Sequence, residues 1–310
     1  MELLIPMILR HIEGIGNIKI RNIIENNYLP KSIDEVQDWL EVVLLKESIN
    51  SKIISNDMFK YILEKVNKIK DDAIQNNAYM ISILNNKYPR LLKEINNAPT
   101  ILFYKGNYEC LMNENIVAIV GTRNPTENGT RVSYKTSEYF ANLGYSIVSG
   151  LAVGCDTYAH KAAIDYKKST IAVMPCGLDS IVPKVNNNLA NNILESGGCL
   201  VSEYECGSTV SKYNYVNRNR IQSGLSKAII VIETSEKGGT IETVNFGMKQ
   251  NKIIACYDCD KDYEEIRGNK KFIKQGKAFS YKTLNDLITI EEKMKENYNI
   301  AGKQINFNIW

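Results

Sequence analysis

The feature that most constrains the fold is a series of short, wholly apolar runs that begins at residue 116. Six such runs alternate with stretches whose apolar residues recur at helical spacing: IVAIVG, YSIVSG, TIAVMP, CLVSE, KAIIVIE and KIIACY. Strands without polar alternation are buried on both faces, and strand–helix repetition is typical of βαβ units. The sequence therefore predicts an α/β fold over residues 116–285, a Rossmann-like, doubly wound and mostly parallel sheet.

Residues 1–85 have a different character, because their apolar residues recur at helical spacing and show no strand alternation. We expect a small N-terminal all-helical domain there. Within it, Gly14 to Gly16 (Gly-Ile-Gly) separates two short helical patterns. This arrangement is typical of helix-hairpin-helix units, whose loop amides meet a DNA phosphate, although the pattern is short and degenerate.

The remaining segments are predicted as connections. Residues 86–115 contain Pro89 and Pro99, which limit regular structure, so we expect a connector that leads into the sheet. Residues 286–310 form a short C-terminal tail, with one charged helical pattern followed by an irregular stretch from residue 297.

Composition excludes several classes of protein. Seven cysteines are scattered over 310 residues, which favours reduced thiols over a disulfide framework. The pair Cys256 and Cys259 lacks a second pair, so we expect no metal and no cofactor. The first residues carry no basic region before an apolar one, and no apolar run approaches the ~20 residues that cross a bilayer. We expect a cytoplasmic protein without a membrane segment. The net charge of +3 does not by itself indicate nucleic acid.

In an open parallel sheet, ligands bind beyond the carboxyl ends of the strands. The first apolar run ends in Gly121, Thr122 and Arg123, and the second in Ser149 and Gly150. Small residues let backbone N–H groups approach an anion, and the arginine fork suits a phosphate. A tight turn is the alternative at any one glycine, but several such strand ends with an arginine favour a phosphate-bearing ligand. The G-x-G-x-x-G spacing of dinucleotide sites is absent, and no acidic residue ends the second strand.

A second cluster mixes basic and aromatic side chains just ahead of the fifth apolar run. It comprises Lys212, Tyr213, Tyr215, Arg218, Asn219 and Arg220. Cations that follow a backbone, with aromatic rings on which bases stack, are what single-stranded nucleic-acid binding requires. The alternative is the exposed charged face of an ordinary helix.

A third group opens a predicted helix with Gly238, Gly239 and Thr240, which is again an anion-binding geometry. Glu242 falls in the first turn of that helix, where it either acts in catalysis or complements the helix dipole. His160 follows Asp156 by about one turn, so a contact between them on one helix face is possible. No nucleophile at motif spacing accompanies His160, which favours a structural role.

Taken together, these segments resemble the DNA-processing protein A (DprA/Smf) family. The resemblance covers about residues 88–280 in the family's order and is strongest in VAIVGTRNPTENG, YSIVSGLAVGCDTYAHKAAI, NRNRIQSGLSKAIIVIE and GGTIETVNFGMKQNKIIA. By motif match, Arg123 falls on the arginine of G-[ST]-R, and Ser149 and Gly150 on S-G-x-A. Arg218 to Arg220 fall on R-N-R, and Gly239 and Thr240 on S-G-[ST].

The resemblance implies an extended Rossmann fold that binds single-stranded DNA, protects it and helps load the RecA recombinase during natural transformation. It also implies a homodimer without enzymatic turnover. The chain departs from the family pattern at Val153, where an arginine is usual, and in KYNYVN before R-N-R. We therefore expect a divergent member that lacks the C-terminal winged-helix domain of many relatives, with a role in DNA uptake or a specialised one.

The rival hypothesis is an enzyme or nucleotide sensor of the same wider Rossmann group. Lonely-guy-type nucleoside-monophosphate phosphoribohydrolases carry G-G-x-G-T-x-x-E, and GGTIETV is similar to it, with Glu242 as the candidate acid. The second spacer and the third glycine of that signature are missing, and the glutamate stands too near.

Overall fold

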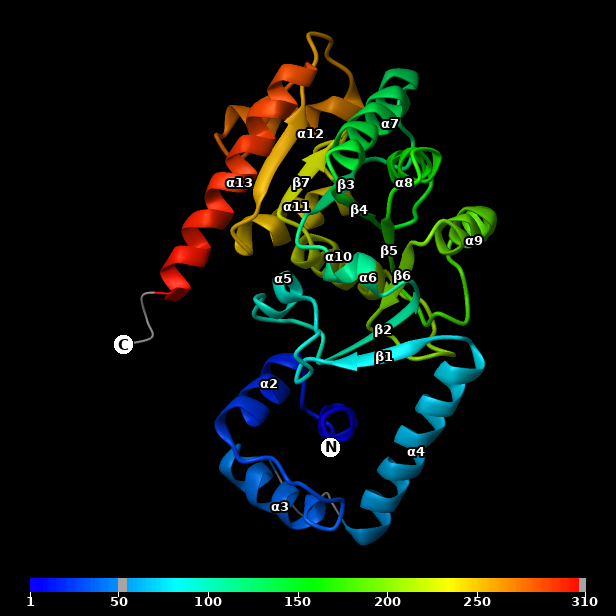
Figure 1. Ribbon diagram of the computed structural model, residues 1–310, viewed down its shortest axis with the longest axis vertical. Helices are drawn as coiled ribbons and strands as arrows, with labels where there is room; N and C mark the ends of the chain where they lie inside the picture. Colours follow the sequence, from blue (N-terminus) through cyan, green and yellow to red (C-terminus); the bar gives the residue numbers. More distant parts are fainter. Residues whose placement is uncertain (50–54, 307–310) are drawn as a thin grey trace.

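The computed structural model describes residues 1–49 and 55–306. In this part of the chain nine strands form one sheet in the order β1-β2-β6-β5-β4-β3-β7-β8-β9 (Figure 1). The strands are β1 Tyr79–Ser82, β2 Ile101–Gly106, β3 Ile116–Val120, β4 Ser146–Ser149, β5 Thr170–Met174, β6 Cys199–Ser202, β7 Ala228–Val231, β8 Ile253–Tyr257 and β9 Phe279–Tyr281. The helices are α1 Leu4–Arg10, α2 Asn17–Asn26, α3 Val36–Lys46, α4 Asn56–Gln75, α5 Arg90–Lys93, α6 Glu109–Met112, α7 Glu127–Asn142, α8 Cys155–Asp165, α9 Asn187–Glu195, α10 Lys212–Leu225, α11 Gly239–Lys249, α12 Arg267–Lys274 and α13 Leu284–Asn306.

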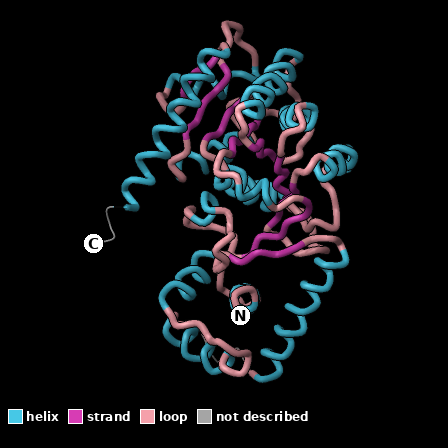
Figure 2. Tube along the Cα trace, in the orientation of Figure 1, coloured by secondary structure: helices cyan, strands magenta, loops and turns pink. Residues whose placement is uncertain are grey.

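The six predicted apolar runs are confirmed as strands β3 to β8, and they form one parallel array. Both faces of the array are buried. Val117 and Ile119 pack toward α7 and α8, whereas Ala118 and Val120 belong to the cluster on the α10 side. Figure 2 shows helices on both sides of the strands. Burial on both faces explains why these runs lack polar alternation. The predicted α/β, doubly wound class is therefore confirmed.

The expectation that residues 1–85 contain no strand is wrong, because β1 follows α4 within that range. The predicted connector is also structured, since it supplies β2 together with α5 and α6. β2 pairs antiparallel with β1 on one side and with β6 on the other, where Phe103 stands opposite Ser202. β1 has only four residues, too few for alternation to reveal it in the sequence.

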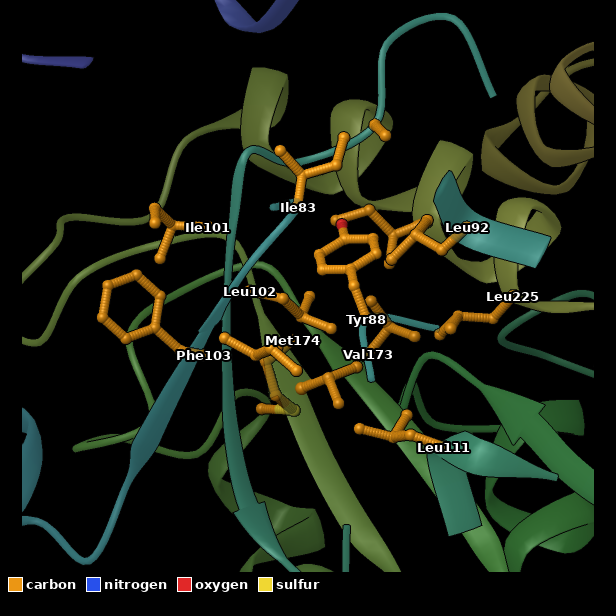
Figure 3. Packing of buried hydrophobic residues seen from close by; sticks show 14 of the residues in the cluster. Ile83, Tyr88, Leu92, Ile101, Leu102, Phe103, Leu111, Val173, Met174 and Leu225 are labelled. Carbon is orange, nitrogen blue, oxygen red and sulfur yellow. The ribbon is translucent and has the colours of Figure 1, made fainter. Parts of the chain in front are cut away.

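One hydrophobic cluster runs from the N-terminal helices through β1 and β2 to α10. Figure 3 shows part of it, where Tyr88 and Leu92 lie beside Leu102 of β2 and Val173 of β5. The Tyr88 hydroxyl is buried and donates a hydrogen bond to the Pro99 carbonyl at 2.6 Å. The helical region, which lies at one end of the molecule in Figure 1, is therefore joined to the sheet by a continuous core.

The C-terminal segment differs in part from its prediction. α13 continues to Asn306, so residues 297–306, which we expected to be irregular, are helical, while residues 307–310 lie outside the described part of the chain. α13 packs on the sheet through Leu287, Ile290 and Met294. Within residues 1–49 and 55–306, no helix has the length and apolar character needed to span a membrane.

Candidate nucleic-acid interface

A pocket of about 360 Å³ opens at the carboxyl ends of β3 and β7. β3 lies between β4 and β7, so the strand order reverses at this point, where open α/β sheets bind their ligands. The loop after β3, the middle of α10 and the start of α11 form the walls. Eight predicted binding residues line it: Gly121, Thr122, Arg123, Arg218, Asn219, Gly238, Gly239 and Thr240.

The loop after β3 is held in shape by Glu233, which follows β7 and is fully buried. Its carboxylate accepts hydrogen bonds from the backbone N–H of Thr126 at 2.8 Å, from the Thr126 hydroxyl at 2.7 Å and from the Tyr263 hydroxyl at 2.7 Å. Its backbone carbonyl accepts from the N–H of Thr122 at 2.7 Å. Thr126 in turn caps α7. One buried glutamate therefore anchors both ends of the loop that carries Arg123.

Arg218 is the buried cation of the pocket, with 5% of its surface exposed. Its Nη1 donates to the Val173 carbonyl at 2.8 Å, and its Nε is buried without a hydrogen-bond partner among the described residues. Asp156 lines the same pocket, and its carboxylate accepts from the N–H groups of Gly150 at 3.0 Å and Ala152 at 3.3 Å. Burial raises the pKa of Asp156, while the Arg218 charge lowers it. Burial also lowers the pKa of Arg218, and the Asp156 charge opposes this.

Arg123 is an exposed cation of the pocket. Its guanidinium lies over the Tyr215 ring, 5.3 Å from the ring centre, in a cation–π contact that joins the β3 loop to α10. Lys237, also exposed, lines the opening from the loop before α11. The pocket therefore combines two exposed cations with an aromatic ring, whereas Arg218 is held inside.

The start of α11 supplies backbone donors to the pocket. Gly238 has φ +137°, a conformation that favours glycine, and it precedes the helix without a capping side chain. Asn219 of α10 donates to the Gly239 carbonyl at 3.0 Å and so fixes this turn. The first N–H groups of a helix have no partner within it and favour an anion.

Four predicted binding residues do not line the pocket. Ser149 is fully buried, and its hydroxyl donates to the Ile119 carbonyl at 2.6 Å. Gly150 lies behind Arg218, and Lys212 is exposed at the first position of α10. The structure corrects the prediction for Arg220, which is 1% exposed and donates to Glu203 at 2.6 Å. A guanidinium enclosed in this pairing does not reach a DNA phosphate.

Two further candidates have structural positions. His160 is fully buried, and its Nδ1 lies 2.7 Å from the Thr170 hydroxyl rather than on Asp156. Because that hydroxyl donates to the Ile147 carbonyl, it accepts from Nδ1–H, and no described residue hydrogen-bonds Nε2. Burial lowers the pKa of His160 to about 3, with a further contribution from Arg218. Glu242 is half-buried in the first turn of α11 and does not line the pocket.

The sequence-based prediction missed several pocket and supporting residues. Lys237 directly precedes Gly238 and Gly239, and this position could have predicted it as a pocket residue. Asp156, Gln222 and Thr243 line the pocket from helices, and only the fold reveals which of their faces meet it. Glu233 gave no signal beyond its place at a strand end. In the described part of the chain, no cluster of three or more metal-binding side chains occurs.

The fold and the pocket define a Rossmann-like α/β protein with a crevice at the carboxyl edge of its sheet that is lined by cationic side chains. Residues 79–292 match the family described as DNA recombination-mediator protein A, and the chain belongs to this family. The predicted resemblance is therefore confirmed, and the chain is related to known DNA-processing proteins.

Two relatives illustrate the similarity in sequence. The chain is 38% identical to protein Smf of Synechocystis sp. over 192 residues, which are 61% of this chain and 48% of the relative. It is 35% identical to the DNA processing protein DprA of Bacillus subtilis over 196 residues, which are 63% of this chain and 66% of the relative. The chain thus spans about half to two thirds of the length of these relatives.

Two solved structures are similar in fold. DprA of Streptococcus pneumoniae has a TM-score of 0.66 and 29% identity, over 89% of this chain and 98% of that one. DprA of Helicobacter pylori has a TM-score of 0.63 and 26% identity, over 70% of this chain and 96% of that one. The H. pylori structure is described as giving insight into a single-stranded DNA binding mode.

Proposed function

We propose that this protein binds single-stranded DNA at the pocket between β3, α10 and α11 and acts as a recombination mediator. The observation that carries the proposal is Arg123 held over Tyr215 beside the open start of α11. This arrangement offers a phosphate a forked cation and free backbone N–H groups, and it offers a base an aromatic ring. Family membership and the single-stranded DNA binding mode described for the H. pylori relative support the same ligand.

The surface beside the pocket suits a strand longer than one nucleotide. Lys212, which is exposed, lies at the start of α10, one turn before the pocket residue Tyr215, and the neighbouring Tyr213 is 72% exposed. Aromatic and basic groups that alternate along a surface are what sequence-tolerant binding of single strands uses. We propose that neighbouring nucleotides contact this first turn of α10.

The finer parts of the proposal rest on family membership. We propose that the protein protects single strands, assists RecA loading as a cytoplasmic homodimer, and does so without enzymatic turnover, in DNA uptake or a specialised role. The position of Glu242 outside the pocket lining disfavours the phosphoribohydrolase alternative. A RecA strand-exchange assay on DNA coated with single-strand-binding protein tests the mediator role. RecA activity that stays unchanged when the protein is added would contradict it.

Fluorescence anisotropy with labelled oligo-dT and a matched duplex, between about 50 and about 200 mM salt, tests the DNA-binding proposal. We expect preference for the single strand and an affinity that falls with salt, because bound phosphates displace counterions. Arg123→Ala should weaken binding similarly for all base compositions and flatten the logarithmic salt slope by about 0.7 for the lost phosphate contact. Unchanged binding in both Arg123→Ala and Arg218→Ala would refute the site.

A further inference from the structure

Glu203, which follows β6, is a buried carboxylate shared by two distant parts of the chain. It is 5% exposed and accepts hydrogen bonds from three side chains. The donors are Asn17 Nδ2 at 2.6 Å, Arg220 Nη2 at 2.6 Å and Asn217 Nδ2 at 3.3 Å. Asn17 begins α2, whereas Asn217 and Arg220 belong to α10. One carboxylate thus joins the N-terminal helices to the helix that carries Arg218.

The N-terminal side of this junction is held by several polar contacts. The Asn17 Oδ1 accepts from the N–H and the hydroxyl of Thr100, each at 3.3 Å. Arg10 of α1 donates to the Glu203 carbonyl at 2.7 Å and lies 3.5 Å from the Glu205 carboxylate. These contacts fix the α1–α2 pair on the sheet at the end of β6.

The α10 side of the junction faces away from the pocket. At about 100° per residue, Arg220 points about 200° from Arg218, so the two arginines lie on opposite faces of α10. Arg220 also donates to the Asn97 carbonyl at 2.9 Å and to the Asn217 carbonyl at 3.0 Å. The pairing on one face therefore sets the rotation of the helix that places Arg218 and Tyr215 in the pocket.

We infer that Glu203 is a positioning residue. It couples the position of the α1–α2 pair on the sheet to the affinity of the pocket for single-stranded DNA. The inference rests on the proposed function. It adds that a residue outside the pocket sets the DNA affinity of the pocket without contacting DNA. When Asn17 donates, the carboxylate has three side-chain donors and holds Arg220 and Asn217 in one place. When Asn17 is lost, the carboxylate is short of one donor, and α10 is free to shift with Arg218.

Asn17→Ala tests the inference, and Asn26→Ala is the matched control. Asn26 lies at the other end of α2, and within residues 1–49 and 55–306 its side chain donates only to the Asn22 carbonyl of its own helix. We expect Asn17→Ala to weaken oligo-dT binding about 5-fold or more, the usual scale of coupling between sites, and to flatten the salt slope. In an Arg218→Ala background the same change should have little further effect, because both act through one cation. A merely structural role would not reproduce this non-additivity.

The outcomes separate this inference from the function on which it rests. Wild-type protein that fails to bind oligo-dT would overturn the proposed function and this inference with it. Wild-type binding with Asn17→Ala equal to Asn26→Ala would overturn the inference alone. If circular dichroism shows Asn17→Ala to be unfolded, Asn17→Asp replaces it, since it keeps an acceptor for Thr100 but repels Glu203. Wild-type affinity in folded Asn17→Asp would also overturn the inference.

Discussion

Gly150→Ala is a small change that should remove the buried cation from the pocket. A Cβ at this position would lie 1.7 Å from Nη1 and 2.4 Å from Cζ of Arg218. Ordinary contact begins at 3.4 Å, so the guanidinium must move by about 1.7 Å. Arg218 is 5% exposed, and its Nη1 donates to Val173 at 2.8 Å. The group therefore cannot move without breaking this bond and leaving its place in the pocket.

The magnitude follows from the contact that is lost. A hydrogen bond to a charged group contributes about 1.5–3 kcal/mol, which corresponds to roughly 10- to 150-fold in affinity. We expect a loss of this size for oligo-dT, measured by fluorescence anisotropy. The double variant Gly150→Ala/Arg218→Ala should bind no worse than Arg218→Ala alone, because both substitutions remove the same cation.

The control for this prediction is Asn26→Ala. Asn26 is exposed, does not line the pocket, and donates to the Asn22 carbonyl of its own helix. We expect wild-type affinity for this variant. If Gly150→Ala binds oligo-dT as tightly as the wild type while remaining folded, the position assigned to Arg218 in DNA binding is refuted.

Three further variants test other parts of the structure. Arg220→Met should lower the free energy of unfolding in urea by about 3–5 kcal/mol, because it leaves the Glu203 carboxylate buried without its cationic partner. A loss below about 0.5 kcal/mol, the size expected for the exposed Lys212→Ala, would refute the buried pairing. His160→Asn should make the stability of the fold less sensitive to acid. The histidine has a pKa of ~6.5 in the unfolded chain and of about 3 in the folded protein, so falling pH favours the unfolded state. At pH ~5 this linkage costs the wild type about 2 kcal/mol. Equal acid-induced shifts of the melting temperature in variant and wild type would contradict this role. Glu242→Ala should cost about 0.3–1 kcal/mol of helix-dipole stabilisation and leave oligo-dT affinity unchanged, whereas release of free base from nucleoside monophosphates by the wild type, lost in the variant, would support the enzyme hypothesis.

The parallel array was predictable because burial on both faces leaves a direct mark, a run without polar residues such as 116–120. β2 carried a similar run, but Pro99 next to it favoured a connector. β1 and β9 are too short for a pattern to appear.

The pocket was predictable to the extent that strand ends converge on one crevice. Arg123 lies in the loop after β3, and Gly238–Thr240 lies at the start of α11, which follows β7, so the fold class alone brings them to one edge of the sheet. Arg218 and Arg220 stand two positions apart on one helix, and the sequence does not state which of them faces the pocket. Which arginine faces the pocket depends on two residues. Glu203 accepts a hydrogen bond from Arg220, and Gly150 has no side chain where the Arg218 guanidinium lies.

The antiparallel pairing of β2 with β6 has a consequence for the order of folding during synthesis. Phe103 and its partner Ser202 are separated by about 100 residues. At the ~5–20 residues per second of translation, β2 waits roughly 5–20 s after its own synthesis for β6 to emerge. During this interval the apolar side of β2, which includes Leu102, has no finished sheet to cover it. We therefore expect chaperones to bind the N-terminal half of the nascent chain. Pulse-labelling of ribosome-bound chains stopped before and after residue 202 would detect the loss of chaperone binding once β6 is available.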